Sequence, residues 1–259
     1  LNWFQEGDRN TRFFHARATS RFQKNLIEGI FDADDVWQVD QEEVEKVFVE
    51  YYSDLFTSSA PSEFAEIVEA VQPKVTQSMN AMLIREFQAS EVHKALKQMY
   101  PLKAPGPDDM PPLFFQKFWS TVGGLVTKTV LDFLNLGITP PKFNETHIVL
   151  IPKIKEPKCV TDYRHISLCN VVFRITSKVI ANRLKKILPS IISDTQSTFV
   201  HGRLITDNVL VAFESMHHIH HKKSGKKGEM ALKLDMSKAY DRVEWVCLER
   251  IMTKLGFEE

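Results

Sequence analysis

The sequence predicts an α+β protein in which helices predominate, and three observations support this prediction. Several segments repeat apolar residues at three- and four-residue steps, which is typical of amphipathic helices. The segment 147–151, which is rich in β-branched residues, is followed by a polar turn and a second expected strand over 163–168, and together they predict a β-hairpin. With 43% apolar and 25% charged residues, the 259-residue chain has an ordinary globular composition and can bury a core.

The N-terminal part is expected to be helical, with helices over 40–57, 62–71, 76–86 and 91–100. The first is the clearest, because apolar and aromatic residues recur on one helical face from Val44 to Leu55. A stretch of Ser, Thr and Pro over 57–62 predicts a break after it. Ser90 is expected to cap the fourth helix.

Prolines and glycines over 101–112 predict a turn-rich loop. The apolar segment 113–137 is expected to be one helix that ends at Gly137, a natural C-cap residue. The hairpin follows. Beyond it, the expected elements are an amphipathic helix over 171–188, a helix from 206 or 207 to about 221, a short apolar strand over 230–234 and a helix over 243–255.

Charge is divided unevenly along a chain whose net charge is zero. Residues 142–250 hold 19 Lys and Arg against 11 Asp and Glu, a net charge of +8, and the rest carries −8. This asymmetry fits a polyanionic partner for the second half, and it fits a globular protein with an uneven surface about equally well. No apolar run approaches the roughly 20 residues that a membrane-spanning helix needs.

Several classes of site find no support in the sequence. Cys159, Cys169 and Cys247 follow no metal spacing and predict free thiols in a reducing compartment. There is no phosphate-cradling Gly loop and no nucleophile elbow. His217 and His221 lie one helical turn apart, but no further ligand is well spaced, so an exposed helix end is the favoured interpretation.

The strongest local signal for chemistry is the segment ALKLDMSKAYDRV over 231–243. An apolar strand would present the carboxylate of Asp235 at its end. Phosphoryl transfer needs such a group, because oxygen ligands hold Mg²⁺ against substrate phosphates. Asp241 lies nearer the following helix and suits a structural role better. A single Asp at a strand end is more often a turn or cap residue, so this segment alone leaves both interpretations open.

This segment resembles motif A of the reverse transcriptases of plant non-LTR (LINE-type) retrotransposons. Other segments resemble the same family, in the family's order. They are 7–15, KAPGPD at 103–108 continued by 113–119, 151–153 with YRHISL at 163–168, 177–185, and QSTFVHGR at 196–203. Six ordered motifs are far more specific than any one of them.

The resemblance implies a right-hand polymerase-like α+β architecture. A helical connector over 1–85 would precede helix-rich fingers with a β-hairpin and the start of a palm sheet over 86–259. The implied activity is RNA-directed DNA polymerisation, with an RNA template, a DNA primer and deoxynucleoside triphosphates as partners and Mg²⁺ as cofactor. The family also implies an intracellular protein of nucleus and cytoplasm that does not enter membranes.

The resemblance assigns roles to single residues. Asp235 is implied as the catalytic residue and ligand of Mg²⁺, and Tyr240 as the aromatic under the sugar of the incoming nucleotide. Lys153 and Arg164, in the hairpin, would hold the triphosphate, since Lys and Arg supply charge and hydrogen-bond donors. Without the resemblance, Tyr240 would be taken as a core aromatic and the two hairpin cations as solvated charges.

Basic residues are also implied in nucleic-acid binding. Arg203 would contact a phosphate of template or primer, although a buried structural pairing suits it nearly as well. The helix over 171–188 carries Arg174, Lys178, Arg183, Lys185 and Lys186. One or two of them, foremost Arg174 and Lys178, are expected to contact the RNA backbone, and the rest to form a solvated face.

The sequence departs from the family pattern at three positions. His165 stands where Pro is usual, Asp109 where Gly is usual, and Thr198 where a smaller residue is commoner. If the backbone at Asp109 needs a positive φ, Asp is tolerated less well than Gly.

Both ends are expected to be cut from a longer protein. The family's second acidic motif, an aromatic-Ala-Asp-Asp turn, would lie beyond residue 259, so this chain alone is expected to be inactive as a polymerase. The segment 31–35 imitates that turn but lies far too early, and a surface turn is expected there. The four tryptophans, Trp3, Trp37, Trp119 and Trp245, are expected in or beside the core.

Overall fold

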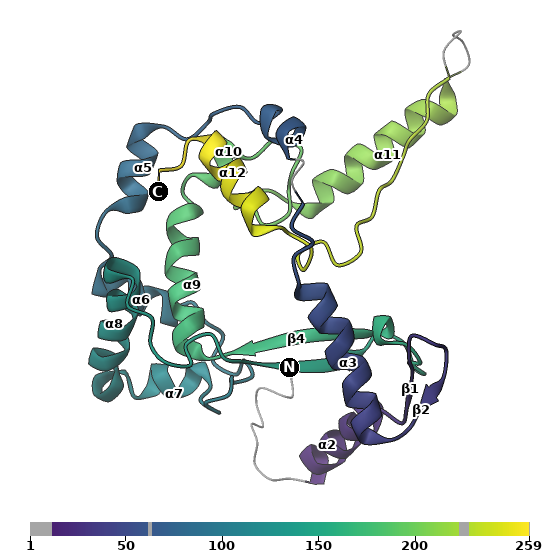
Figure 1. Ribbon diagram of the computed structural model, residues 1–259. Coiled ribbons are helices and arrows are strands. Elements are labelled where there is room, and N and C mark those ends of the chain that lie inside the picture. The colour runs from purple at the N-terminus through teal and green to yellow at the C-terminus, as the bar shows by residue number, and fades with distance from the viewer. Residues whose placement is uncertain (1–11, 62–63, 223–227, 259) are drawn as a thin grey trace. The chain divides into compact units, whose positions relative to one another are not determined.

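The computed structural model describes residues 12–61, 64–222 and 228–258 (Figure 1). Trp3 therefore lies outside the described residues, and so does most of the N-terminal motif over 7–15. The chain forms two compact units that interleave along the sequence. Unit 1 comprises Leu1–Thr57, Ala104–Asp109 and Asn144–Asn170, and unit 2 comprises Ser58–Lys103, Met110–Phe143 and Val171–Glu259. The mixture of helices and small sheets is that of an α+β protein, as predicted.

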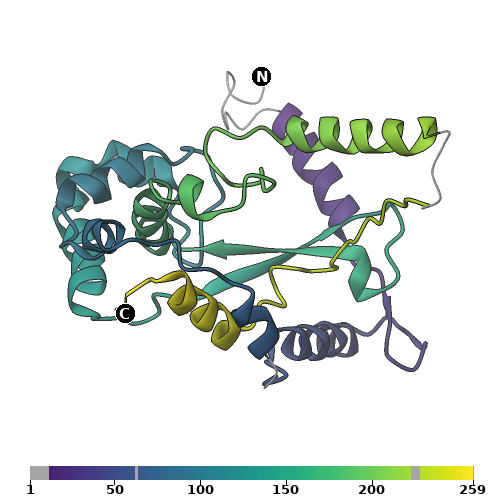
Figure 2. The same ribbon diagram turned by 90° about the horizontal axis from the view of Figure 1, so that it is seen from above.

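Unit 1 contains two antiparallel β-hairpins and two longer helices. The elements are α2 (Arg12–Asn25), β1 (Ile30–Phe31), β2 (Trp37–Gln38), α3 (Gln41–Phe56), β3 (Thr146–Pro152), a 3₁₀ turn over Val160–Asp162 and β4 (Tyr163–Cys169). The pairing of β3 with β4 runs from Thr146↔Cys169 to Pro152↔Tyr163, which confirms the predicted hairpin and extends it at both ends. Figure 2 shows α2 running up to this hairpin, which it contacts through β3.

A small aromatic core holds unit 1 together. Phe48 and Tyr52 of α3, both buried, pack with Tyr163 and with Ile30 of β1. The rings of Phe48 and Tyr163 meet edge to face at 5.4 Å, a favoured geometry for aromatic pairs. Helix α3 begins one residue later than predicted, because Asp40 accepts hydrogen bonds from the backbone N–H groups of Glu42 and Glu43. The core thus ties the segment before residue 57 to the β3–β4 hairpin.

The acidic segment 31–35 forms the predicted surface turn, between β1 and β2. One carboxylate oxygen of Asp32 accepts hydrogen bonds from the backbone of Asp34 and Val36, and the other accepts one from the Gln38 side chain. Asp35 adopts a left-handed conformation with φ 58°. The segment 31–35 therefore resembles an acidic catalytic turn in its sequence only, and the carboxylate of Asp32 stabilises the turn.

Unit 2 is helical in its described part. Its helices are α4 (Ala65–Glu69), α5 (Gln77–Ile84), α6 (Ala89–Lys97), α7 (Pro112–Lys117), α8 (Trp119–Leu136), α9 (Val171–Leu184), α10 (Leu188–Ile191), α11 (Ile205–His221) and α12 (Trp245–Leu255). The core lies between α6, α8 and α9, with Phe115 of α7 at its edge. Val92, Val130 and Ile175 are fully buried there. Of the helices in the described ranges, none is long and apolar enough to cross a membrane.

Some helix boundaries differ from the predictions because tertiary contacts override the local pattern. The single helix expected over 113–137 is broken at Phe118, whose ψ of 23° ends α7 and starts α8. Gln116 fixes α7 by donating to the backbone carbonyls of Leu96 and Met99 at the end of α6. The predicted end at Gly137 is confirmed, with φ 69°.

Two further boundaries differ from their predicted places. Helix α6 starts before Ser90, because Gln88 is the N-cap and its backbone N–H donates to Glu91 in a capping box. The helix expected over 171–188 ends at Leu184, where a turn leads into α10.

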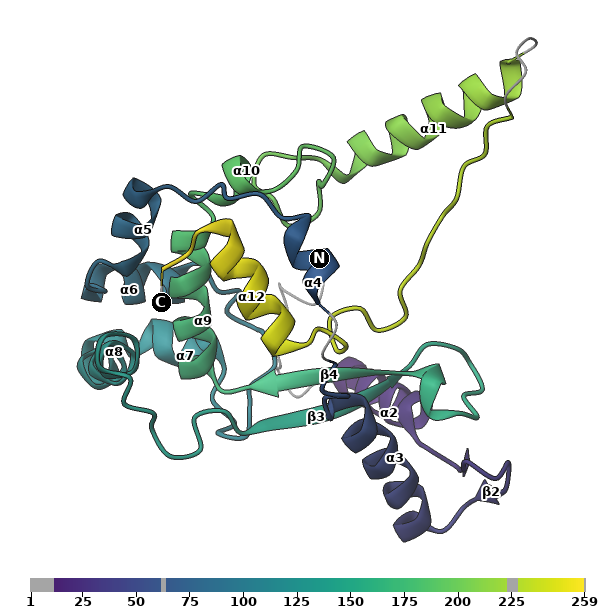
Figure 3. The ribbon, with the colours of Figure 1, turned by 45° about the horizontal axis from the view of Figure 1, so that its top comes forward.

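The predicted strand over 230–234 is wrong. This segment is irregular and its apolar side chains are exposed, and in the described ranges no strand pairs with it. A strand is stabilised by its hydrogen-bonded neighbours, so the apolar alternation of 230–234 is not sufficient alone. Figure 3 shows this segment running back from the end of α11, a helix with no buried residue. Trp245 is 80% exposed, which contradicts its predicted place in the core.

Candidate functional site

Asp235 lies in the irregular segment that precedes a turn over 237–242, and it is exposed. In the residues that the structure describes, no group of three or more His, Cys, Asp or Glu side chains could hold a metal ion. The carboxylate of Asp235 is therefore a single candidate ligand, and the described residues do not complete a metal site around it. The predicted motif is present in the sequence without the strand that was expected to present it.

Tyr240 lies in the turn that follows Asp235. The turn is closed by backbone hydrogen bonds from Asp241 and Arg242 to the carbonyl of Lys238, at 3.0 and 3.2 Å. The Tyr240 ring is 77% exposed and meets Phe199 edge to face at 6.1 Å. Its alternative interpretation as a core aromatic is therefore wrong.

The hairpin residues Lys153 and Arg164 belong to unit 1, whereas Asp235 and Tyr240 belong to unit 2. Lys153 follows β3 directly, and its amine donates to the carbonyl of Thr161 at 2.6 Å. Arg164 is exposed on β4, opposite Ile151. Lys153 therefore closes the hairpin loop, while the guanidinium of Arg164 faces solvent.

The hairpin loop between β3 and β4 is organised by Asp162. Its carboxylate accepts hydrogen bonds from the backbone N–H groups of Lys158 and Cys159, at 2.9 and 3.0 Å. These two bonds, with a smaller contribution from the charge of Lys153, lower the pKa of Asp162. The carboxylate therefore stays ionised and holds the loop in one conformation.

The basic residues of α9 have different environments. Arg174 and Lys178 are half-buried, and burial lowers the pKa of Lys178, with the charges of Lys185 and Lys103 adding to the effect. Lys185 and Lys186 are exposed beyond the end of the helix. The repulsion between neighbouring cations decreases when an anion binds among them. This part of α9 therefore suits contact with phosphates.

Arg183 is not available for nucleic acid. It is 2% exposed, and its guanidinium makes two hydrogen bonds to the carboxylate of Glu91, at 2.9 and 2.7 Å. It also donates to the carbonyls of Leu83, Arg85 and Glu86 and lies over the ring of Phe87, 3.5 Å from its centroid. Arg183 therefore joins α9 to the segment between α5 and α6.

Arg203 likewise takes the structural role that was its alternative. Its guanidinium donates to the carbonyls of Ser193 and Gln196 and, at longer distance, of Pro189 and Ile192. It also pairs with Asp194 at 3.2 Å. The side chain closes the loop that leads from α10 to α11, so its donors are already used.

The loop over 103–108 packs against the end of β4. A Cβ at Gly106 would lie 2.5 Å from the backbone at the junction of Cys169 and Asn170, so no other residue fits without movement. The Asn170 side chain accepts a hydrogen bond from the backbone of Asp108 at 3.2 Å. Asp109 has φ 54°, which meets the condition under which Gly would be preferred there.

The two histidines one turn apart in α11 form a local pair. The rings of His217 and His221 stack at 4.0 Å, and Nδ1 of His221 lies 2.9 Å from the carbonyl oxygen of His217. Within the described ranges, no third ligand for a metal ion lies near them. The favoured interpretation as an exposed helix end agrees with this geometry.

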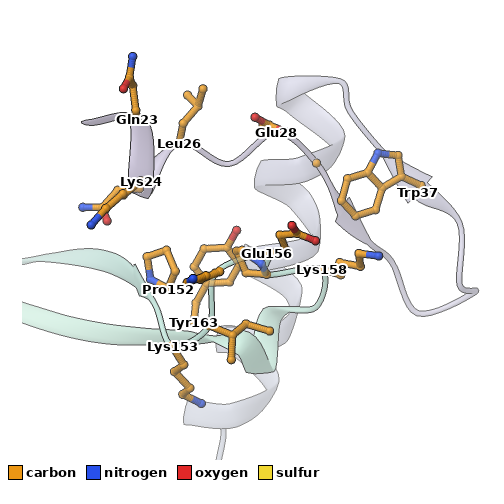
Figure 4. Close-up of a pocket in the computed structure, with 15 residues that line it drawn as sticks. Gln23, Lys24, Leu26, Glu28, Trp37, Pro152, Lys153, Glu156, Lys158 and Tyr163 are labelled. Atoms are coloured by element: carbon orange, nitrogen blue, oxygen red, sulfur yellow. The ribbon is translucent and has the colours of Figure 1, made fainter. Parts of the chain in front are cut away.

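A cavity of about 890 Å³ lies within unit 1, and no motif of the sequence predicts it (Figure 4). It is lined by the end of α2, by Leu26, Glu28 and Gly29, by Trp37, by the hairpin loop and by Tyr163. Lysines predominate over glutamates in the lining. Lys153, Lys155 and Lys158 lie close together in the sequence, but nothing in the sequence places α2 and Trp37 beside them.

Residues 151–259 match the family model of the reverse transcriptase (RNA-dependent DNA polymerase). The chain is 29% identical over 239 residues to a protein of Xenopus laevis described as the transposon TX1 uncharacterized 149 kDa protein. The alignment covers 92% of this chain and 18% of that protein, so the chain spans under a fifth of its relative. The chain is therefore similar to a transposon protein over most of its length, and its residues 151–259 match the reverse transcriptase domain.

Proposed function

We propose that the chain is the fingers and the beginning of the palm of an RNA-directed DNA polymerase from a non-LTR (LINE-type) retrotransposon, of the kind found in plants. The observation that carries this proposal is the reverse transcriptase match over 151–259, which includes the hairpin loop, β4 and Asp235. The ordered motifs upstream support it, since they include the loop over 103–108 that packs on β4. Residues 1–85 would be a connector and 86–259 the polymerase part.

The proposed substrates are an RNA template, a DNA primer and deoxynucleoside triphosphates. Lys153 and Arg164 would contact the triphosphate, and Tyr240 the nucleotide sugar. Arg174 and Lys178 would contact the template backbone, because both lie on α9 among cations. Arg203 is proposed to act indirectly, by holding the loop between α10 and α11 rather than by touching phosphate. The intact protein would work inside the cell, in nucleus and cytoplasm.

Asp235 would be one ligand of the Mg²⁺ that such a polymerase uses when the metal is bound. Two-metal phosphoryl transfer needs more than one carboxylate to fix both ions. The sequence predicts one of these carboxylates in this chain. We therefore propose that the chain by itself does not polymerise.

A second candidate function is RNA binding without catalysis, in a remnant that has lost polymerase activity. The exposed, irregular segment around Asp235 favours it, since a preorganised metal site needs supported ligands. The half-buried cations of α9 serve this function as well as the first.

Primer extension tests the proposal. The purified chain is incubated with an RNA template, a labelled DNA primer, deoxynucleoside triphosphates and Mg²⁺, and the Asp235→Asn variant serves as control. We expect the chain to bind the primer–template and to add no nucleotide. Synthesis that depends on Mg²⁺ and is lost in Asp235→Asn would overturn the proposed inactivity, and absence of binding at low salt would contradict the polymerase assignment.

A further inference from the structure

We propose that the cavity of unit 1 binds one nucleotide unit of a single-stranded nucleic acid, with the base against Trp37 and the phosphates beside Lys24, Lys155 and Lys158. The inference rests on the proposed function and deepens it. The template strand would then contact residues of this cavity in addition to those that the family resemblance implies. Four observations support it: an exposed aromatic ring, an excess of cations, a fixed loop and a suitable volume.

Trp37 supplies a flat surface that is held in place. It is 41% exposed, although indole rings are mostly buried in folded proteins. The ring lies against Gly29, where a Cβ would come within 2.6 Å of it, and it meets Phe31 edge to face at 5.0 Å. These contacts fix the orientation of the ring, and its exposed part can stack with a base of any identity.

The lining of the cavity attracts anions. Lys24, Lys153, Lys155 and Lys158 contribute to it against Glu28 and Glu156. Figure 4 shows Lys158 on the same side as Trp37, Lys24 on the opposite side, and the amine of Lys153 pointing away. In the described part of the chain, Lys24, Lys155 and Lys158 make no ion pair with another residue. Their charges therefore remain available to phosphates.

The loop that carries Lys155 and Lys158 is fixed before any ligand arrives. The backbone N–H of Phe31 donates to the carbonyl of Lys158 at 2.8 Å, which ties the loop to β1 beside Trp37. Asp162 holds the backbone of Lys158 from the other side. A site that is already ordered loses less conformational entropy on binding.

The cavity volume of about 890 Å³ lies within the range of ~300–1,000 Å³ typical of ligand sites. The floor is formed by Tyr163, which is itself buried against Phe48. An aromatic wall with cations on two sides matches a base linked to phosphates. A purely apolar ligand would leave the lysines uncompensated, and a bare phosphate would not use the ring.

The aromatic contact is tested with two substitutions at Trp37 in the complete chain. Binding of a fluorescein-labelled single-stranded RNA is followed by fluorescence anisotropy. Trp37→Leu keeps apolar bulk but has no aromatic face, and we expect it to weaken binding roughly tenfold. Trp37→Phe keeps an aromatic face and is expected to stay within about threefold of the wild type. Equal weakening in both variants, or no weakening in Trp37→Leu, would overturn the stacking contact.

The cationic contact is tested with the double variant Lys155→Ala/Lys158→Ala, whose side chains are exposed and whose removal leaves the core intact. The slope of log K against log salt concentration should fall by roughly 0.7 for each phosphate that the variant no longer binds. The matched control, Lys97→Ala/Lys254→Ala, removes two exposed lysines of unit 2 and should leave the slope unchanged. The same change in both double variants would mean non-specific attraction and would overturn the site.

Further outcomes test this inference separately from the proposed function. If the wild-type chain binds RNA and every cavity variant binds equally well, the cavity proposal fails while the polymerase assignment stands. If the wild-type chain binds a primer–template but no single-stranded RNA, the cavity proposal fails and the polymerase assignment stands, and if it binds neither, both fail. A mononucleotide that binds the cavity while the strand does not would overturn the strand as the ligand.

Discussion

Gly106 shows how one residue fixes the approach of two segments. Its Cα lies against the backbone that joins Cys169 to Asn170, and an added Cβ would overlap it at 2.5 Å. We expect Gly106→Ala to destabilise the protein by about 2 kcal/mol, because backbone atoms on both sides must shift. The matched control is Gly124→Ala in α8, where a Cβ meets nothing within 4 Å and helix propensity favours Ala.

Urea unfolding of the two variants measures this difference. Gly124→Ala should leave the free energy of unfolding unchanged or raise it by up to about 1 kcal/mol. Equal effects of the two substitutions would mean that the contact between the 104–109 loop and β4 is not as tight as the structure has it.

Asp109 provides a second prediction at the residue scale. Its φ of 54° is the left-handed conformation, which Gly adopts without strain and Ala does not. The chain with Asp109→Gly should therefore be about 1 kcal/mol more stable than the chain with Asp109→Ala. Thermal unfolding of both variants, each compared with wild type, checks this order, and the reverse order would contradict the backbone conformation.

Single residues of the candidate site were predicted unevenly. The departure from the family pattern at Asp109 pointed correctly to a special backbone position. Arg183 could not be told from the solvated cations of its helix, and for Arg203 a phosphate contact could not be separated from a structural pairing. In both cases the partners are backbone carbonyls or a carboxylate that only folding brings close. The environment of Asp235 was also beyond prediction, since the strand expected to present it does not form among the described residues.

At the scale of elements, the ion pair between Arg183 of α9 and Glu91 of α6 joins two helices of the core. Arg183→Lys keeps the charge but not the planar fork, and its amine cannot reach the carboxylate and three carbonyls together. We expect a decrease of about 3 kcal/mol in the free energy of unfolding. The exposed pair of Lys128 with Asp132 is the control, and Asp132→Asn should cost under about 0.5 kcal/mol.

The same pair makes stability depend on pH. The hydrogen bond from Arg183 is the main cause that lowers the pKa of Glu91 below its ordinary value of 4.5. Because the folded-state pKa is the lower one, the stabilisation is complete above about pH 4.5 and is lost as the pH falls through the lowered value. Urea unfolding between pH 3 and 7 should show a shallower pH dependence for Glu91→Gln than for wild type. An unchanged dependence would assign the acid sensitivity to other carboxylates.

Elements with a strong internal pattern were predicted well, and elements that depend on neighbours were not. Helix α3 and the β3–β4 hairpin carry their own period and turn signals, and both were found within two residues of their predicted ends. The break at Phe118 depends on the contact of Gln116 with α6, which no local pattern records. The segment 230–234 has the composition of a strand, but a strand also needs a partner.

At the scale of the whole molecule, each of the two compact units is built from segments that are far apart in the sequence. Unit 1 gathers the segment before residue 57, the loop over 104–109 and the β3–β4 hairpin, and unit 2 gathers the helices between and after them. The boundary at residue 85, between a connector and a polymerase part, was predicted from the family resemblance and stays a prediction. The excess of positive charge over 142–250 is shared by the hairpin and the region of α9.

This distribution of charge gives the most direct test of the central claim, that the chain binds the template and primer of a polymerase. The affinity of the purified chain for an RNA–DNA primer–template is measured between about 50 and 300 mM salt. The account predicts binding that weakens linearly in log–log form, with a slope that Lys178→Ala reduces by roughly 0.7–0.9. Binding that is absent at the lowest salt, or a slope near zero, would contradict it.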